Sequence, residues 1–528
     1  MPLPVISVAQ MCEWENASWA AGRSPAAVIK NVGRALARRA LDLTSRDDTI
    51  LVLAGRGHNG DDARAACPFL SGRSHIGDGI RAAYRHLSRR KVVLVEALDP
   101  RTAAREFSRK IQPAPGRERP KLLVDGLFGI GLNRPLEGPW KNLIDVVNQS
   151  GLPVLSVDVP SGLNADNGQV EGAAIRAEVT LTVGAPKRGL LQAPEWVGRL
   201  EVAPDIGLIP CPLAGELNWT LPEDFAAWPP RRPLESNKGT FGHAVIIAGS
   251  LGYHGAAVLA ARGALRAQPG LVTVETQESV YIPVAAQLQA AMVRPWRPAR
   301  PLPKNATAIL FGPGLAADNL PKALEKELRA HWKNFPGPMI VDASALDWLR
   351  PSLASALRAD EFPSPREAGR GSGRGVGSIQ ESQSPDSPGT PPAGPVRVIT
   401  PHPGEAGRLL GISAQEVQAD RAGALRQLSG LFSNCYVVLK GNHTLVGRAG
   451  GAIYINSSGN PLLAQGGSGD LLGGYLAGLL AQPACRQDPL TAIRFAVWQH
   501  GAAADDTSQC RSAWTLDDLV LNLGSVRP

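Results

Sequence analysis

One short segment near the end of the chain combines glycines with a single carboxylate. Residues 466–470 read Gly-Gly-Ser-Gly-Asp and are followed by small and apolar residues typical of a helix. Glycines before a helix leave backbone N–H groups free to surround an anion, and the helix dipole adds to the attraction. Asp470 would then accept a proton from a hydroxyl group that attacks a phosphoryl group in this loop. The alternative is a glycine-rich packing segment with Asp470 as its N-cap.

Two other segments of the second half carry groups suited to a nucleotide. Residues 437–444, VVLKGNHT, end a predicted strand with Lys440 and Thr444, a cation and a hydroxyl that suit nucleotide phosphates. Between prolines, just before a predicted helix, lie His402 and Glu405. These two residues could instead be structural, with His402 satisfied in its loop and Glu405 serving as a charge at the helix N-terminus.

A glycine pattern opens the first half. Gly55, Gly57 and Gly60 form G-x-G-x-x-G directly after a predicted strand, which is typical of dinucleotide-binding folds. In such a fold an acidic residue at the end of the next strand binds a ribose, and Glu96 or Asp99 could serve.

Three more polar side chains follow two further predicted strands of the first half, namely Asp125, Asp158 and Ser161. Carboxyl ends of parallel strands meet at one edge of a sheet, so these groups should converge. Carboxylate, amide and hydroxyl oxygens are hard ligands that suit a monovalent or divalent cation. For Asp158 the alternative is an Asx-turn before Pro-Ser-Gly.

The elements that must position these groups are buried strands alternating with Ala-, Leu- and Arg-rich helix patterns, which predicts an α/β protein with parallel sheets covered by helices. A chain of 528 residues is too long for one core, so we expect two domains. The predicted strands are 49–55, 91–98, 121–129, 152–160, 179–185, 243–250, 270–276, 306–314, 337–344, 396–402 and 435–441.

Composition predicts the domain limits. We place a first domain at 1–222, a proline-rich linker at 223–238 and a second domain at 239–528. Residues 361–395 are rich in Gly, Pro, Ser and Arg and are predicted to be a disordered insertion. Residues 61–76 are also predicted to be an insertion, because GHNG is expected to pass directly into the helix opened by GDGIRAAYRHL.

Bulk properties argue against several classes of protein. The net charge of +8 comes with scattered arginines and no nucleic-acid-binding signature. The six cysteines lie far apart, which argues against a disulfide framework and a structural zinc site. The N-terminus lacks a secretory signal, and the longest apolar helix candidate is too short to span a membrane. We expect a soluble, cytoplasmic homo-oligomer that binds neither nucleic acid nor membranes.

In the second half, the motifs and their order resemble the ADP-dependent NAD(P)H-hydrate dehydratase family, which has a ribokinase-like fold. They are SNKGTFGHAVIIAGSLGYHGAAVLAARGAL, FGPGL, VDASAL, TPHPGE, LKGNHT and GNPLLAQGGSGDLLGGYLAGLLAQ. Ala316 stands where the family more often has glycine. The resemblance implies Mg²⁺ and ADP as cofactor and co-substrate, and Asp470 as catalytic base. It implies that ADP contacts Lys440, Gly441, Asn442, His443, Thr444 and Gly469, and that the hydrated nicotinamide contacts Ala256, Gly314, His402 and Asp470.

The first half resembles the NAD(P)H-hydrate epimerase family, a Rossmann-like three-layer sandwich often fused ahead of the dehydratase. The likeness is strongest over residues 121–207, which include TVGAPKRGL and DIGL. It implies that Asn59, Asp125 and Ser161 bind K⁺ and that Asp158 exchanges a proton at C6 of the substrate. The implied substrate-binding residues are His58, Asn59, Gly60, Asp62, Asp78, Gly129, Ile130, Gly131, Leu132, Asn133, Arg134, Pro135 and Asp158.

One departure from the epimerase pattern concerns the glycine turn. The family has two adjacent asparagines and then Gly-Gly-Asp-Gly, whereas this chain has His58 at the first position. The acid of the motif is Asp62 by plain counting or Asp78 after the predicted insertion. We prefer Asp78, because GDGIRAAYRHL continues the family pattern; an inserted loop would then weaken or block the site.

Together the two resemblances imply a bifunctional repair enzyme that epimerises R and S NAD(P)H hydrates and dehydrates the S form with ADP, giving AMP and phosphate. A ribokinase-like vitamin or sugar kinase with a non-catalytic N-terminal nucleotide-binding module is the alternative, although the fused first domain argues against it. In a third hypothesis the first domain only binds a nucleotide-like ligand or RNA, and that binding would depend strongly on salt.

Overall fold

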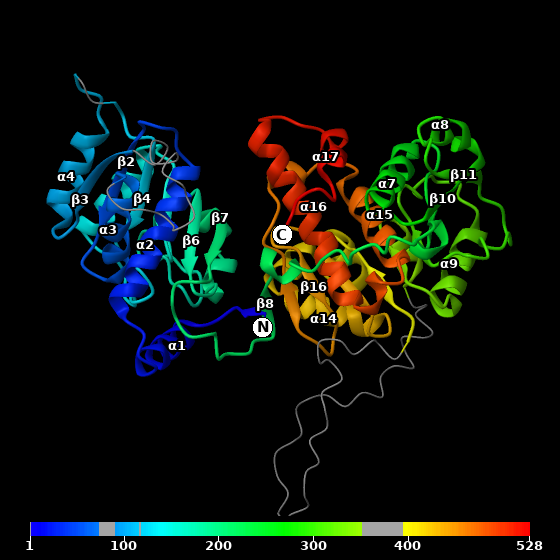
Figure 1. Ribbon diagram of the computed structural model, residues 1–528, viewed down its shortest axis with the longest axis horizontal. Helices are drawn as coiled ribbons and strands as arrows, with labels where there is room; N and C mark the ends of the chain where they lie inside the picture. Colours follow the sequence, from blue (N-terminus) through cyan, green and yellow to red (C-terminus); the bar gives the residue numbers. More distant parts are fainter. Residues whose placement is uncertain (1, 73–89, 116–117, 351–393) are drawn as a thin grey trace, which may run out of the picture. The chain divides into compact units, whose positions relative to one another are not determined.

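The computed structural model describes residues 2–72, 90–115, 118–350 and 394–528 (Figure 1). It divides into two compact units, Met1–Trp219 and Thr220–Pro528. In the described part of the chain, no helix has the length and apolar character needed to cross a membrane.

A parallel sheet with strand order β3-β2-β4-β5-β6-β7 forms the centre of the N-terminal unit. Alternate residues of the central strand β2 face opposite helix layers, since Ile50 and Val52 lie in one apolar cluster and Leu51 and Leu53 in the other. Helices α2 and α3 cover one face, and α4 and α5 cover the other. The predicted three-layer arrangement is therefore confirmed.

The elements of this unit have the following bounds: β1 Leu3–Pro4, α1 Val8–Ala20, α2 Pro25–Asp42, β2 Thr49–Ala54, α3 His58–Leu70, β3 Lys91–Glu96, α4 Pro100–Ile111, β4 Leu122–Gly126, α5 Pro139–Gln149, β5 Val154–Val157, β6 Val179–Val183, α6 Pro194–Val197, β7 Arg199–Ala203 and β8 Leu217–Trp219.

In the C-terminal unit the strand order is β17-β16-β15-β14-β13-β12-β9-β10-β11. The strands from β15 to β11 are parallel, whereas β16 and β17 are antiparallel additions. Helices α7, α15 and α16 lie together and pack their apolar residues on the sheet (Figure 1). Every strand predicted from the sequence is present in one of the two sheets.

The bounds here are β9 His243–Ile247, α7 His254–Arg266, β10 Leu271–Thr276, α8 Tyr281–Ala285, β11 Met292–Pro295, β12 Ala308–Phe311, α9 Lys322–Asn334, β13 Met339–Val341, α10 Ala345–Trp348, β14 Arg397–Ile399, α12 Pro403–Leu410, α13 Ala414–Ala419, α14 Arg421–Leu431, β15 Tyr436–Leu439, β16 Leu445–Gly447, β17 Ile453–Ile455, α15 Ser468–Ala481, α16 Pro489–Cys510 and α17 Leu516–Asn522.

The predicted insertion at residues 61–76 is wrong where the structure describes it. Helix α3 begins at His58 and continues to Leu70, so these residues form the helix that follows the glycine turn. Its apolar residues Ala63, Ala66 and Phe69 recur at helical spacing and are buried against the sheet. Residues 73–76, the helix expected from residue 77 and Asp78 lie outside the described residues.

The predicted linker at 223–238 is also wrong in its first part. The ring of Phe225 is fully buried and lies 5.5 Å from the ring of Phe495 and 5.4 Å from that of Trp498 on α16. This segment therefore belongs to the core of the C-terminal unit. The predicted disordered insertion at 361–395 lies outside the described residues apart from its last two positions.

Helices α7 and α15 approach each other closely enough for their backbones to touch. A β-carbon at Gly474 would lie 1.8 Å from the carbonyl oxygen of Ala260, and one at Gly263 would lie 2.2 Å from that of Leu471. The packing interpretation of the glycine-rich segment is therefore right for the glycines inside α15. The glycines of residues 466–470 precede or begin that helix.

Replacing Gly474 by alanine should lower the free energy of unfolding by about 1 to 3 kcal/mol, because the new methyl group has no room beside Ala260. The matched control is Gly430→Ala in α14, where a β-carbon meets nothing within 4 Å. That control should leave stability unchanged or raise it by up to about 1 kcal/mol. Thermal unfolding of both full-length variants measures the difference; equal effects would contradict the backbone contact.

Candidate active sites

In the C-terminal unit the chemically active side chains follow the carboxyl ends of adjacent strands. Asp342 follows β13, His402 and Glu405 follow β14, and Lys440 follows β15. Asp470 lies in the first turn of α15. Strand order therefore brings together residues that are far apart in the chain.

The ammonium of Lys440 lies between acidic groups. Its Nζ donates a hydrogen bond of 2.9 Å to Oδ1 of Asp342 and lies 3.7 Å from Oε2 of Glu405. A β-carbon at Gly469 would lie 3.2 Å from the same Nζ, which places the lysine at the glycine loop. Burial lowers the pKa of Lys440, but the nearby carboxylates together raise it above its ordinary value, so this side chain stays charged.

Asp470 has the electrostatics expected of a base. Burial raises its pKa to about 7, and the neighbouring Asp342 adds to the rise, while Lys440 opposes it. A carboxyl group that titrates near neutrality can both accept and release a proton. The N-cap interpretation is wrong, because Gly467 is the N-cap, with a φ of 96°, and Asp470 lies inside the helix.

His402 and Glu405 form the N-terminal cap of α12. Nδ1 of His402 accepts hydrogen bonds from the backbone N–H groups of Gly404 and Glu405, at 3.0 and 3.2 Å. Oε2 of Glu405 accepts the backbone N–H of His402 at 2.8 Å. The structural interpretation therefore holds for these atoms, and Glu405 also faces Lys440.

The loop Lys440–Thr444 turns sharply between β15 and β16. Gly441 has a φ of 135° and His443 a φ of 51°, both in the left-handed region. The Thr444 hydroxyl donates to the carbonyl oxygen of Gly441 at 3.0 Å, and Nδ1 of His443 lies 3.3 Å from the carbonyl oxygen of Asn456. These contacts hold the loop in a compact conformation.

Ala256 and Gly314 are neighbours in the structure. A β-carbon at Gly314 would lie 2.8 Å from that of Ala256. The hydroxyl of Ser250 donates to the carbonyl oxygen of Gly314 at 2.6 Å and accepts the N–H groups of Ala316 and Ala317, each at 3.2 Å. Sequence reasoning missed Ser250, although it lies in the glycine turn after β9.

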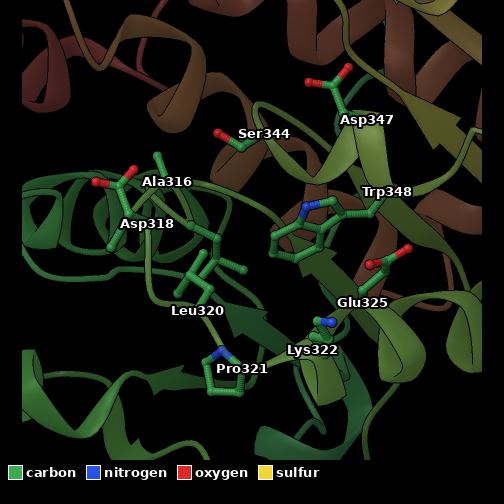
Figure 2. A pocket seen from close by; sticks show the side chains of 11 residues that line it. Ala316, Asp318, Leu320, Pro321, Lys322, Glu325, Ser344, Asp347 and Trp348 are labelled. Atoms are coloured by element: carbon green, nitrogen blue, oxygen red, sulfur yellow. The ribbon is translucent and has the colours of Figure 1, made fainter.

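Next to Gly314, a pocket of about 360 Å³ opens at the carboxyl ends of β12 and β13 (Figure 2). Its lining combines the indole of Trp348 with several carboxylates and one lysine, a mixture that suits a polar ligand with a flat ring. The lining residues are Leu315, Ala316, Ala317, Asp318, Leu320, Pro321, Lys322, Glu325, Ser344, Asp347 and Trp348.

In the N-terminal unit, the structure brings together the three residues predicted to bind a cation. The hydroxyl of Ser161 donates to Oδ1 of the buried Asp125 at 2.6 Å. Nδ2 of Asn59 and Oγ of Ser161 both reach the carbonyl oxygen of Phe128, at 3.1 and 3.3 Å. Burial raises the pKa of Asp125, and the hydrogen bonds from Ser161 oppose that rise. The three residues thus lie around the carbonyl oxygen of Phe128 and the carboxylate of Asp125. Their binding of K⁺ stays a prediction.

Asp158 pairs with Lys187, a residue to which sequence reasoning assigned no role. Oδ1 of Asp158 accepts hydrogen bonds from Nζ of Lys187 at 2.5 Å, from Oγ1 of Thr182 at 2.9 Å and from the N–H of Val183 at 3.0 Å. Lys187 is fully buried. Asp158 has a φ of 62°, so its backbone is held in the strained left-handed region.

Asp62 lies in the first turns of α3 and is buried near Asp158. Burial raises its pKa to about 8, and the charge of Asp158 adds to the rise. The other acid considered for the motif, Asp78, lies outside the described residues. Asp62 therefore lies within electrostatic reach of Asp158, without any inserted loop between the glycine turn and the helix.

The remaining predicted substrate residues form a loop after β4. Gly129 passes so close to Asn59 that a β-carbon would lie 2.1 Å from Oδ1 of Asn59. Beyond it, the loop is partly or fully exposed from residue 130 to 135. Of the two acids considered for ribose binding, Glu96 forms an ion pair of 2.6 Å with Arg64, and Asp99 caps α4.

Comparisons with known proteins agree with the division of the chain into an N-terminal and a C-terminal unit. Residues 25–189 match the family described as YjeF-related protein N-terminus, and residues 244–361 and 385–523 match the NAD(P)H-hydrate dehydratase family. The bifunctional NAD(P)H-hydrate repair enzyme of Gloeobacter violaceus is 33% identical over 543 residues, which cover 98% of this chain and 96% of that relative. The chain belongs to the bifunctional NAD(P)H-hydrate repair enzyme family.

Two further similar proteins are a bifunctional repair enzyme and a solved dehydratase structure. The bifunctional NAD(P)H-hydrate repair enzyme of Coxiella burnetii is 34% identical over 411 residues, covering 75% of this chain and 73% of the relative. A crystal structure of ADP/ATP-dependent NAD(P)H-hydrate dehydratase from Bacillus subtilis is 29% identical, with a TM-score of 0.45, and covers 57% of this chain and 95% of that one. The predicted epimerase and dehydratase halves are confirmed at the level of the family, and the kinase alternative is not needed.

Replacing Lys187 by methionine in this repair enzyme should lower the free energy of unfolding by about 3 to 5 kcal/mol, because it leaves Asp158 buried and unpaired. Epimerisation should be lost as well. Adding Asp158→Asn to that variant should recover part of the stability but none of the activity. Thermal unfolding of the full-length proteins should show that the wild type is the most stable, the double variant less stable and Lys187→Met the least stable. A double variant no more stable than Lys187→Met would contradict the pairing of Lys187 with Asp158.

Asp470→Asn should stabilise the protein at alkaline pH. The pKa of Asp470 lies above its ordinary value of 3.8, at about 7, so the folded state favours the protonated carboxyl. Stability from this group is therefore largest below pH 4 and is lost as the pH rises to about 7. The variant should exceed the wild type by on the order of 2 to 4 kcal/mol at pH 8 and match it at pH 4. Urea unfolding across this range measures both values, and a constant difference would contradict the raised pKa.

Proposed function

We propose that the C-terminal unit dehydrates the S form of NAD(P)H hydrate at the expense of ADP, with Asp470 as the general base. The observation that carries this proposal is the position of Asp470, next to Lys440 at the N-terminus of α15, with a pKa of about 7. A base of that pKa is half ionised near neutral pH, where proton transfer by a carboxylate is effective.

The chemistry divides into two steps. In the first step, Asp470 takes the proton of the C6 hydroxyl. The oxygen of that hydroxyl attacks the β-phosphorus of ADP, and AMP leaves. In the second, the C6–O bond to the phosphate breaks as C5 loses a proton, which restores the C5=C6 double bond and releases phosphate. Backbone N–H groups of the glycine loop and the charge of Lys440 stabilise the negative charge of the transferring phosphoryl group.

Asp342 and Glu405 are the residues that would hold Mg²⁺. Within the described part of the chain, no cluster of three or more His, Cys, Asp or Glu side chains is arranged to hold a metal by itself. Mg²⁺ is commonly bound by one or two carboxylates together with nucleotide phosphates, and these two carboxylates fit that pattern. When bound, Mg²⁺ would neutralise part of the phosphate charge.

For the N-terminal unit we propose epimerisation of the R and S hydrates, with Asp158 as the group that accepts the proton and Asp62 as the group that returns it. Lys187 keeps a cation against Asp158, which favours the ionised carboxylate that accepts the proton. Asp62 holds its proton up to about pH 8 and can therefore return one. Asn59, Asp125 and Ser161 would hold K⁺ beside the substrate. The cytoplasmic location and the homo-oligomeric state remain predictions.

The test is a repair assay on a mixture of R and S NADPH hydrates with magnesium, followed by the return of dihydronicotinamide absorbance. With ADP, recovery should pass the S fraction and reach completion faster than spontaneous epimerisation allows. Asp470→Asn should abolish recovery, and Asp158→Asn should stop it at the S fraction. Recovery that does not need ADP or ATP would rule out the proposed dehydration, and the rates with ADP and with ATP show which nucleotide is preferred.

A further inference from the structure

Arg421, the first residue of α14, lies behind the loop Lys440–Thr444. We propose that Arg421 is a positioning residue for the nucleotide, which turns amide N–H groups of this loop toward the phosphates and places a positive charge behind them. This inference rests on the proposed function, since ADP at this loop is itself part of that proposal.

The guanidinium of Arg421 contacts the loop through its carbonyl oxygens. Nη1 donates to the carbonyl oxygen of Asn442, and Nη2 donates to those of Leu439 and Lys440 at 3.1 and 3.4 Å. A β-carbon at Gly441 would lie 3.2 Å from Nη2, so the guanidinium packs directly against the backbone of the turn. One side chain thus fixes three peptide groups of a sharply turning loop.

These contacts also determine where the N–H groups point. In a trans peptide the C=O and N–H bonds point in opposite directions. Because the carbonyls of Lys440 and Asn442 point toward Arg421, the N–H groups of Gly441 and His443 point away from it. Neighbouring N–H groups turned to one side in a loop with left-handed residues form an anion-binding concavity.

Charge supports the same role. Lys440, the other cation of the loop, is paired with Asp342. Within the described ranges of the chain, no carboxylate pairs with Arg421, and its Nε is buried without a hydrogen-bond partner. The adjacent Asp420 instead caps α14 by accepting the N–H of Gly423 at 2.8 Å.

Burial lowers the pKa of Arg421 to about 10, so the group remains charged at neutral pH. A partly buried cation whose Nη atoms donate to carbonyl oxygens is stabilised when an anion binds nearby. The diphosphate of ADP, bound on the opposite side of the loop, is such an anion. Arg421 would therefore act on the nucleotide through the loop and not by direct contact.

The experiment compares Arg421→Met, Arg421→Lys and Arg426→Met in the full-length protein. Arg426 is the matched control, because it lies on the same helix and also donates to carbonyl oxygens, those of Ala449 and Gly451, at 2.9 and 3.3 Å. The measurements are the Kd of ADP by calorimetry, KM for ADP and kcat in the dehydration assay, and the melting temperature.

Arg421→Met should raise Kd and KM for ADP about tenfold or more, with a smaller change in kcat, because the amides lose their orientation and the charge is gone. Arg421→Lys keeps the charge but lacks the planar fork, so its effect should be intermediate. It also serves as the test if Arg421→Met does not fold. Arg426→Met should leave Kd and KM for ADP unchanged, whatever it does to the melting temperature.

Two results would overturn the inference. If the Arg421 variants and Arg426→Met lower the melting temperature alike and all bind ADP as the wild type does, Arg421 is only a structural link between α14 and the loop. If the wild-type protein itself does not bind ADP, the proposed function fails, and the role of Arg421 fails with it. Calorimetry on the wild type distinguishes these two failures.

Discussion

The largely buried ammonium of Lys440 lies among acidic groups that follow separate strands. Asp342, Glu405 and Asp470 would repel one another there, and removing any of them from water is costly. Lys440 offsets part of that cost through its hydrogen bond to Asp342 and its proximity to Glu405. The compensation is incomplete, and the remaining repulsion together with burial leaves Asp470 with a raised pKa. The raised pKa of Asp470 and the raised pKa of Lys440 thus result from one electrostatic arrangement.

A similar arrangement occurs in the N-terminal unit, on a different sheet. Lys187 is buried against Asp158, and Asp62 lies close enough to feel the charge of Asp158. In both units one carboxylate pairs with a lysine, and a second carboxyl group keeps its proton to near neutral pH. Two carboxyl groups with separated pKa values are a common basis for acid–base catalysis. The two halves of the repair enzyme therefore obtain similar acid–base properties from unrelated sets of strands.

Much of the fold and part of the site could be predicted from the sequence. Runs of β-branched residues located every central strand, because such strands are buried on both faces and leave a continuous apolar signal. Strands β1, β7, β8, β11, β16 and β17 were not predicted. Of these, β16 and β17 have only three residues each, too few to show a period. Lys187 was missed because its partner Asp158 is 29 residues away, and the contact exists only after the chain has folded around β6.

The error of predicting an insertion at residues 61–76 has a different physical origin. The stretch after residue 76 resembles the family pattern, but Ala63, Ala66 and Phe69 already recur at helical spacing and place one apolar face of a helix against the sheet. For His402 and Glu405 the structural alternative holds, and the predicted contact of His402 with the substrate stays a prediction. Their inner atoms cap a helix, while the carboxylate of Glu405 reaches Lys440.

The contact between α7 and α15 has a consequence for how this protein tolerates change. Ala256 lies in the first turn of α7 and Asp470 in the first turn of α15, and the two helices touch through main-chain atoms of Ala260 and Gly474. Their separation is then set by backbone dimensions and not by the volume of any side chain. Mutations that enlarge or shrink residues elsewhere in this core can accumulate without altering the spacing between these two positions. Drift in the sequence of the core and the spacing of Ala256 and Asp470 are in this way largely independent of each other.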